Sequence, residues 1–170
     1  MKKRNIVLTG FMAAGKTSVS AIIARKLKMD VIATDDIISR REEMSISDIF
    51  AKQGEEYFRG LERELVREIS SKEGCIFDCG GGIILDERNI YDLKSRGKVF
   101  YLKASPELIY ERAKLDDKRP LLKVKDPMAK IRELLLLREP LYSKADHTIL
   151  VDDKTFEQVA DEIIRIIKNG

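Results

Sequence analysis

The chain has 170 residues, enough for one domain with a substantial hydrophobic core. Apolar residues make up 44% and charged residues 36%, as in a folded protein with a strongly charged surface. Lys plus Arg number 32 and Asp plus Glu number 29, so the net charge is only +3. Such a small excess argues against bulk affinity for nucleic acid or membranes. We expect a single domain that spans residues 1–170.

The cysteines, the histidine and the apolar runs exclude several further classes of protein. Cys75 and Cys79 lie far from the only histidine, His147, so they form no zinc-binding motif. The longest apolar runs are too short to span a membrane, and the N-terminus lacks the pattern of a signal peptide. We therefore expect two reduced thiols in a cytoplasmic protein.

Short apolar runs alternate along the chain with stretches in which apolar residues recur at helical spacing. The runs predict strands at residues 5–9, 31–35, 75–77, 99–102 and 148–151. Eight helical stretches are expected: one that begins at residue 16, one that ends at 41, one that begins at 45, one that follows Gly54, three over 86–96, 106–114 and 127–139, and one that begins at 155. Pro140 is expected to stop the helix over 127–139. This alternation predicts an α/β fold, a parallel sheet covered by helices on both faces.

The first predicted strand runs into a glycine-rich motif. Residues 10–17, Gly-Phe-Met-Ala-Ala-Gly-Lys-Thr, match the P-loop pattern G-x-x-x-x-G-K-[ST]. Glycines let successive N–H groups point at phosphate oxygens, and the following helix adds the positive end of its dipole. Lys16 would reach the β and γ phosphates of ATP, and the Thr17 hydroxyl would ligate Mg²⁺. The predicted nucleotide contacts are Gly10, Ala13, Ala14, Gly15, Lys16, Thr17 and Ser18. A chance glycine turn is the alternative, which the flanking strand and helix disfavour.

Two further groups of residues are candidates for substrate handling. The polar, basic stretch 115–126 is long enough to be a lid within residues 112–126, and it carries Arg119. Asp35, Arg59, Arg138 and the glycines Gly80, Gly81 and Gly82 lie at strand ends and loops. Paired arginines suit a carboxylate, because the planar guanidinium donates two parallel hydrogen bonds.

At these residues the sequence closely resembles the shikimate kinases over nearly its whole length. The matching stretches, in order, are the P-loop, 34–35, 54–59 with Glu62, 80–82, 119–122, and 138–142 with 145–146. The resemblance implies a five-stranded, three-layer α/β/α P-loop fold of the nucleoside-monophosphate-kinase type with a mobile lid. It also implies a monomer that uses ATP and Mg²⁺ to phosphorylate the 3-hydroxyl of shikimate, in the pathway to aromatic amino acids.

The same resemblance implies a role for each candidate residue. Asp35 would bind the acceptor hydroxyls and take a proton, within an acceptor-binding region of about residues 33–62. Arg59 and Arg138 would hold the shikimate carboxylate, and Gly80 to Gly82 would let the backbone approach the ring. Arg119 would reach the transferring phosphate as an arginine finger in cis. Arg112 would pack on the adenine face.

Each of these residues also has a purely structural interpretation. Asp35 could cap the helix that follows it. Arg59 and Glu62 could form a surface ion pair, and the three glycines could form an ordinary turn. Arg138 could lie at a solvated helix end. The functional interpretation is favoured because all of these residues fall where a parallel sheet presents its ligands.

The sequence departs from the family at one carboxylate. Shikimate kinases usually carry Asp-x-Asp at the end of the second strand, where this chain has Ala33-Thr34-Asp35. Asp78 ends the third predicted strand, in the manner of the carboxylate that holds Mg²⁺ in other P-loop enzymes. We therefore assign Thr17 and Asp78 to the metal, with the alternative that Asp78 only caps the glycine turn.

Two other functions compete with shikimate phosphorylation. A kinase for another small hydroxy acid, such as gluconate, would share the P-loop, the fold and the lid. A catalytically inactive nucleotide-binding module is suggested by Ala33, although Lys16, Thr17, Asp35 and Arg119 are all retained.

Overall fold

A computed structural model describes residues 4–115 and 124–169 of the chain. Its centre is a five-stranded parallel sheet in the order β2-β3-β1-β4-β5. The strands are β1 (Asn5–Thr9), β2 (Asp30–Ala33), β3 (Cys75–Asp78), β4 (Gly97–Lys103) and β5 (His147–Leu150). All five predicted strands are confirmed, and their parallel arrangement follows from the helices that connect them.

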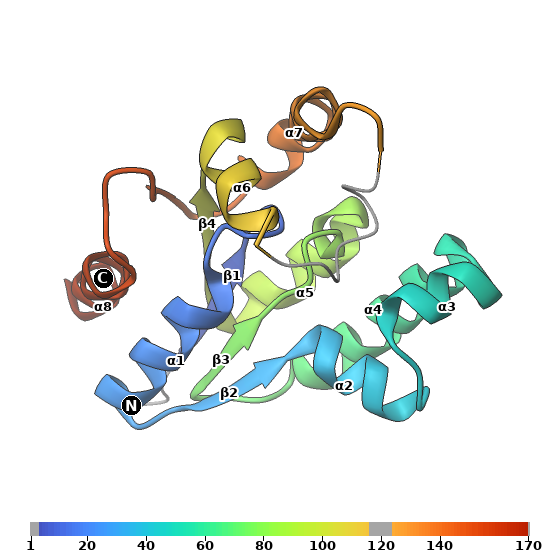
Figure 1. The fold of residues 1–170 in the computed structure, drawn as a ribbon. Helices are drawn as coiled ribbons and strands as arrows, with labels where there is room; N and C mark the ends of the chain where they lie inside the picture. Colours follow the sequence, from blue (N-terminus) through green and yellow to red (C-terminus); the bar gives the residue numbers. More distant parts are fainter. Residues whose placement is uncertain (1–3, 116–123, 170) are drawn as a thin grey trace.

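Eight α-helices and one short 3₁₀ helix are found in the described parts of the chain. They are α1 (Lys16–Leu27), α2 (Thr34–Arg41), α3 (Ile46–Gln53), α4 (Glu55–Ile69), η1 (Ile83–Leu85), α5 (Glu87–Arg96), α6 (Pro106–Ala113), α7 (Pro127–Tyr142) and α8 (Phe156–Asn169). Helices α1 and α8 pack together on one side of the sheet, and α5 lies on the other (Figure 1). The predicted three-layer α/β/α fold is therefore confirmed.

The ends of several helices follow the predicted capping chemistry. Ser105 accepts a hydrogen bond from the Leu108 N–H and begins α6, with Pro106 at the first helical position. Thr155 and Gln158 exchange side-chain to backbone hydrogen bonds and form the expected capping box before α8. These local signals are strong because they satisfy N–H groups that have no partner inside the helix.

Two predicted boundaries are wrong, and both affect the site. Strand β2 ends at Ala33 rather than Asp35, because its partner β3 ends at Asp78, opposite Ala33. Asp35 therefore lies in the first turn of α2. Helix α7 does not end at Pro140 but continues to Tyr142. A proline inside a helix removes one backbone hydrogen bond, and side-chain contacts of Glu139 and Tyr142 with the rest of the protein hold this last turn in place.

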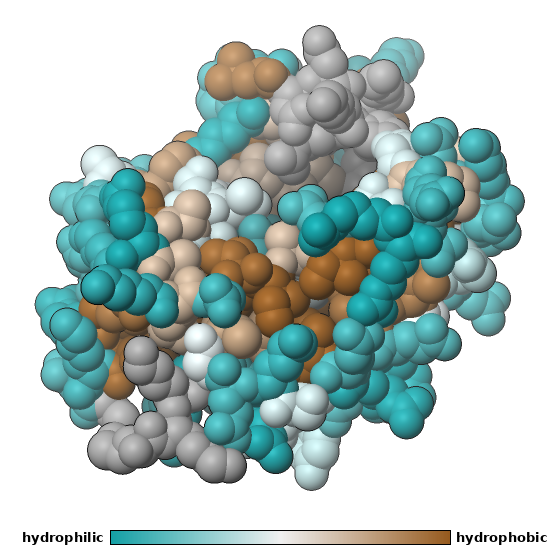
Figure 2. All heavy atoms as spheres, turned by 90° about the horizontal axis from the view of Figure 1, so that it is seen from below, coloured by the Kyte–Doolittle hydropathy of each residue, from teal (hydrophilic) through white to brown (hydrophobic). Residues whose placement is uncertain are grey.

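The hydrophobic core lies around the central strand. Ile6, Val7 and Leu8 of β1 are fully buried, as expected for a parallel strand covered on both faces. Hydrophilic side chains surround a band of apolar ones on the face seen from below (Figure 2). Within residues 4–115 and 124–169, no helix is long and apolar enough to cross a membrane. Cys75 and Cys79 are both free thiols, as predicted.

Candidate active site

The P-loop connects β1 to α1 in the strained backbone conformation that its glycines permit. Gly10 and Gly15 have φ angles of 147° and 100°. A Cβ atom on Gly10 would lie 2.7 Å from the Leu102 carbonyl oxygen, so no other residue fits there. The Lys16 ammonium group donates hydrogen bonds to the Gly10 and Phe11 carbonyls, at 2.9 and 3.0 Å. The lysine is thus held over the loop whose N–H groups face the phosphate site.

The Thr17 hydroxyl is positioned by a carboxylate from the neighbouring strand. It donates a hydrogen bond to Asp78 Oδ2 at 2.7 Å. Asp78 is buried, and this burial raises the pKa of its carboxyl group, while the Thr17 hydrogen bond and the Lys16 charge lower it. The side chain of Asp78 contacts the P-loop helix instead of capping the glycine turn.

Asp35 is held at the mouth of the glycine run by its neighbour Thr34. The buried Thr34 hydroxyl accepts a hydrogen bond from the Gly80 N–H at 2.9 Å. A Cβ atom on Gly80 would collide with Asp35 Oδ1, so any side chain at this position would displace the Asp35 carboxylate. The N-cap residue of α2 is Ala33, and Asp35 makes no capping hydrogen bond. Burial raises the pKa of Asp35, the nearby Asp78 raises it further, and Lys16 and Arg59 oppose both effects.

Arg59 and Glu62 form an ion pair on α4, but not at the surface. The Arg59 Nη1 atom lies 2.5 Å from Glu62 Oε2, and the Glu62 side chain is only 1% exposed. A second pair, with Glu55 at 3.0 Å, fixes the other side of the guanidinium. Burial raises the pKa of Glu62 to about 7, against the lowering effect of Arg59. Glu62 Oε1 has no hydrogen-bond partner within the described residues.

Arg138 approaches the P-loop from helix α7. Its guanidinium lies 5.6 Å from the centre of the buried Phe11 ring, a cation–π contact. The side chain is half-buried rather than at a solvated helix end. Arg59 in turn lies against Gly82, where any side chain would collide with the guanidinium. The two arginines therefore reach the glycine run and the P-loop from different helices.

An aromatic residue that sequence reasoning missed lies beside the P-loop. The Arg112 guanidinium donates to the carbonyls of Ala13 and Ala14, both at 3.2 Å, and lies 4.9 Å over the ring of Phe156. That ring also covers Gly15, because a Cβ there would lie 2.6 Å from Phe156 Cε1. The sequence offered only one signal for Phe156, its position just after the fifth strand.

Most of the predicted site residues line one cavity of about 580 Å³. Those that line it are Ala13, Gly15, Lys16, Thr17, Ser18, Asp35, Asp78, Gly80, Gly81 and Arg112, and Phe156 lines it as well. Five predicted residues are absent from its lining but adjoin it through the contacts described above: Gly10, Ala14, Arg59, Gly82 and Arg138. Arg119 and most of the predicted lid, 116–123, lie outside the described residues.

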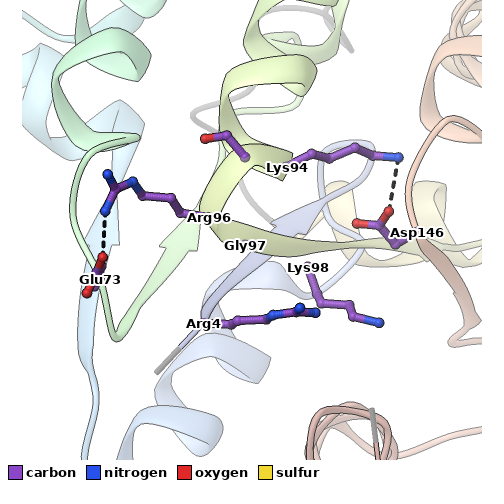
Figure 3. A pocket seen from close by; sticks show the side chains of 8 residues that line it. Arg4, Glu73, Lys94, Arg96, Gly97, Lys98 and Asp146 are labelled. Atoms are coloured by element: carbon purple, nitrogen blue, oxygen red, sulfur yellow. Dashed lines mark hydrogen bonds and ion pairs between the residues drawn. The ribbon is translucent and has the colours of Figure 1, made fainter. Parts of the chain in front are cut away.

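A second hollow, of about 420 Å³, lies at the opposite end of β1 and β4 (Figure 3). Its carboxylates are paired with cations: Asp146 with Lys94 and Glu73 with Arg96. Both of these cations belong to the last turn of α5, where positive charge complements the helix dipole. No predicted site residue lines this hollow, so the catalytic site is assigned to the first cavity.

A parallel sheet that places a P-loop beside a carboxylate and two arginines defines a P-loop kinase for a small acidic acceptor. The family model for shikimate kinase matches residues 12–168. A shikimate kinase of Caldanaerobacter subterraneus is 47% identical over 95% of both chains, and one of Thermus thermophilus is 42% identical over 94% of this chain and 87% of the relative. The chain belongs to the shikimate kinase family.

Solved structures agree with this assignment. Shikimate kinase from Acinetobacter baumannii, in complex with shikimate, superposes with a TM-score of 0.93 at 37% identity, covering 98% of this chain and 94% of that one. The enzyme from Aquifex aeolicus gives a TM-score of 0.79 at 34% identity, with 97% and 96% covered. The chain therefore has the fold of an ATP-dependent small-molecule kinase.

Proposed function

We propose that this chain transfers the γ-phosphoryl group of ATP to the 3-hydroxyl of shikimate, giving shikimate 3-phosphate and ADP. One observation carries the proposal: the phosphate-binding loop, Asp35, Gly80 and Gly81 share a cavity that two arginines adjoin. This arrangement supports a donor phosphate and an acidic acceptor held side by side. Binding both in a reactive orientation is the main source of catalysis in phosphoryl transfer.

On the donor side, the P-loop amides and Lys16 bind the phosphates, and Arg112 with Phe156 binds the adenine base. The contact between Arg112 and Phe156 supports this role, because it places a flat cation and an aromatic ring at one end of the cavity. Arg119 neutralises the charge that develops on the transferring phosphate. Its role rests on the sequence alone.

On the acceptor side, Arg59 and Arg138 bind the carboxylate while Asp35 accepts the proton of the attacking hydroxyl. The buried Glu62 fixes Arg59, so the guanidinium is oriented before the acceptor arrives. The raised pKa of Asp35 supports its role as a base, since a carboxylate with a higher pKa binds a proton more readily. Gly80 to Gly82 leave room for the ring.

Magnesium fits the oxygen atoms that this site presents. The Thr17 hydroxyl and the Asp78 carboxylate lie together at the P-loop, and Mg²⁺ prefers such oxygen ligands, with several of its waters kept. When bound, the ion would neutralise negative charge on the phosphates of ATP. Thr17 would bind it directly, and Asp78 would orient its water shell in place of the carboxylate that Ala33 lacks. No cluster of three or more His, Cys, Asp or Glu suited to a metal is found in residues 4–115 and 124–169.

A coupled assay of ADP release with shikimate tests the proposal. We expect turnover that requires shikimate and is abolished by Lys16→Ala, which removes the phosphate-binding ammonium group. Gluconate and other hydroxy acids serve as competing acceptors, and turnover with one of them at a higher kcat/KM would identify a different kinase. Nucleotide binding without turnover on any acceptor would identify an inactive binding module.

A further inference from the structure

Tyr142 lies in residues 138–142, one of the stretches that match the shikimate kinases, but the proposed function gives it no role. Its side chain is 1% exposed, and its hydroxyl donates a hydrogen bond of 2.5 Å to the Gly81 carbonyl. The two residues are 61 positions apart in the chain. The bond therefore joins the last turn of α7 to the middle of the glycine run.

This bond fixes the orientation of one peptide unit in the acceptor site. In a planar trans peptide, the carbonyl of Gly81 and the N–H of Gly82 point in opposite directions. With the carbonyl held by Tyr142, the Gly82 N–H is turned away from Tyr142. Gly82 is buried, and its N–H donates no hydrogen bond within residues 4–115 and 124–169. A buried N–H without a partner is rare, and an acceptor atom of a ligand bound beside Arg59 would satisfy this donor.

The Gly82 N–H lies next to groups of both the acceptor site and the phosphate-binding loop. Gly82 is packed against the Arg59 guanidinium, and Gly81 lies between Tyr142 and the P-loop backbone at Gly10 and Met12. The Gly81–Gly82 peptide unit therefore lies between elements of the donor site and the acceptor site. The hydroxyl of Tyr142 is the side-chain group that bonds the carbonyl of this unit.

Because α7 continues past Pro140, Tyr142 lies on the helix and its hydroxyl reaches the Gly81 carbonyl. Arg138 and Tyr142 are four residues apart on one helix, so they lie on the same face. Between them, Glu139 accepts hydrogen bonds from the Tyr101 hydroxyl at 2.7 Å and from Lys103 at 2.5 Å, which anchor the turn to β4. Arg138 and the Tyr142 hydroxyl therefore belong to one rigid unit.

We propose that Tyr142 is a positioning residue of the acceptor site, which aims the Gly82 N–H at the acceptor by holding the Gly81 carbonyl. The inference rests on the proposed function, since it concerns the binding of the same acceptor. It gives shikimate a backbone hydrogen-bond donor beside Arg59, set in place by the helix that carries Arg138. ATP binding does not depend on this bond.

The chain offers a matched control for the test. Tyr101 is equally buried, and its ring stacks on that of Tyr142 with centres 4.7 Å apart and planes 7° apart. Its hydroxyl donates a hydrogen bond to Glu139. In Tyr101→Phe this bond is lost, but Lys103 still pairs with Glu139. Tyr142→Phe and Tyr101→Phe thus remove the same atom from neighbouring rings, but only the first releases Gly81.

We expect Tyr142→Phe to raise the KM for shikimate about 5- to 30-fold, because the acceptor loses a hydrogen bond from the oriented Gly82 N–H. The KM for ATP should stay within about twofold, and Tyr101→Phe should leave both constants within about twofold. The Tyr142 hydroxyl also interacts with Arg138, so the KM values show that the hydroxyl serves the acceptor site, and the Gly82 amide resonance described below separates an effect on the peptide from one on Arg138. Equal shikimate KM values in the two variants, or an equal rise for ATP, would overturn the proposal.

A second measurement needs no turnover. In the free enzyme labelled with ¹⁵N-glycine, Tyr142→Phe should shift the Gly82 amide resonance, and Tyr101→Phe should leave it in place. If the wild-type protein does not phosphorylate shikimate, the proposed function fails, while these resonances still decide whether Tyr142 orients the peptide. An unchanged Gly82 resonance in Tyr142→Phe contradicts the inference even if the enzyme is active.

Discussion

Ala33 and Asp78 are paired in register on the adjacent parallel strands β2 and β3. Each is the last residue of its strand, so both lie at the carboxyl edge of the sheet, where ligands bind. Neighbouring strands are about 4.8 Å apart. A carboxylate on either strand therefore reaches the same space, and Asp78 already bonds the Thr17 hydroxyl there.

Asp78→Ala should weaken the use of Mg²⁺ and leave the acceptor site intact. We expect a higher Mg²⁺ concentration at half-maximal rate, a lower kcat and an unchanged KM for shikimate, because the lost carboxylate bonds Thr17 and influences Asp35 only through its charge. Combining it with Ala33→Asp should restore much of the activity, since the carboxylate returns one strand away. Titration of Mn²⁺ into the nucleotide complex, followed by electron paramagnetic resonance, gives the metal affinity directly.

The control for this prediction is Asp36→Ala, because Asp36 lines the same cavity and makes no hydrogen bond to Thr17. Its metal affinity should match that of the wild type. If Asp78→Ala shows unaltered Mn²⁺ affinity and Mg²⁺ dependence, Asp78 serves only to position Thr17.

Arg138→Ala should impair acceptor binding selectively. Loss of a bidentate partner to a carboxylate costs roughly 2–5 kcal/mol, so the KM for shikimate should rise at least about 30-fold. Binding of ATP, measured by calorimetry, should hardly change. Arg132→Ala is the matched control, because Arg132 lies on the same helix, is exposed and pairs only with Glu107 among the described residues. A parallel loss of ATP affinity in Arg138→Ala would refute its assignment to the acceptor.

The buried Glu62 should make stability depend on pH near neutrality. Its pKa is raised from 4.5 to about 7 by burial, so between these values the folded state binds more protons than the unfolded state. Its stabilising contribution is therefore fully present below about pH 4.5 and is lost as the pH rises through about 7. The total change is about 3 kcal/mol for a shift of this size.

Urea unfolding of the wild type and of Glu62→Gln, at several pH values from 5 to 8, tests this expectation. The wild type should lose free energy of unfolding relative to Glu62→Gln as the pH rises, and the difference should level off above about pH 8. A difference that is constant over this range would show that Glu62 titrates well below neutrality. The exposed pair partner Glu55 provides the control variant Glu55→Gln, which removes a charge beside Arg59 and leaves Glu62 in place.

Phe156→Ala should weaken nucleotide binding without affecting the acceptor. The ring covers Gly15 and stacks with Arg112, so its loss removes one wall of the adenine site and frees the guanidinium. We expect the KM for ATP to rise about 3- to 10-fold, in line with a cation–π and stacking contact of about 1 kcal/mol. Phe156→Tyr keeps the aromatic face and should behave as the wild type. A rise in the KM for shikimate instead of ATP would disprove the assignment.

Several site residues could be identified from the sequence because their signals are local. Lys16 of the P-loop, the serine cap of α6 and the capping box of α8 each bond backbone groups within a few residues. The end of β2 and the end of α7 were misjudged for the opposite reason. Strand β2 stops where its partner stops, and α7 continues past Pro140 because Glu139 and Tyr142 bond groups outside the helix.

By itself, the sequence determined the alternating fold, the phosphate loop and the set of residues that resembles an acceptor site. Spacing along the chain encodes these features, since strand and helix periods and glycine positions are properties of short segments. Tertiary structure alone decided that Asp78 meets Thr17 and that Tyr142 meets Gly81, each pair 61 residues apart. It also decided that Glu62 is buried beside Arg59. Such contacts depend on how elements pack, and burial then sets the pKa values that no local pattern of residues contains.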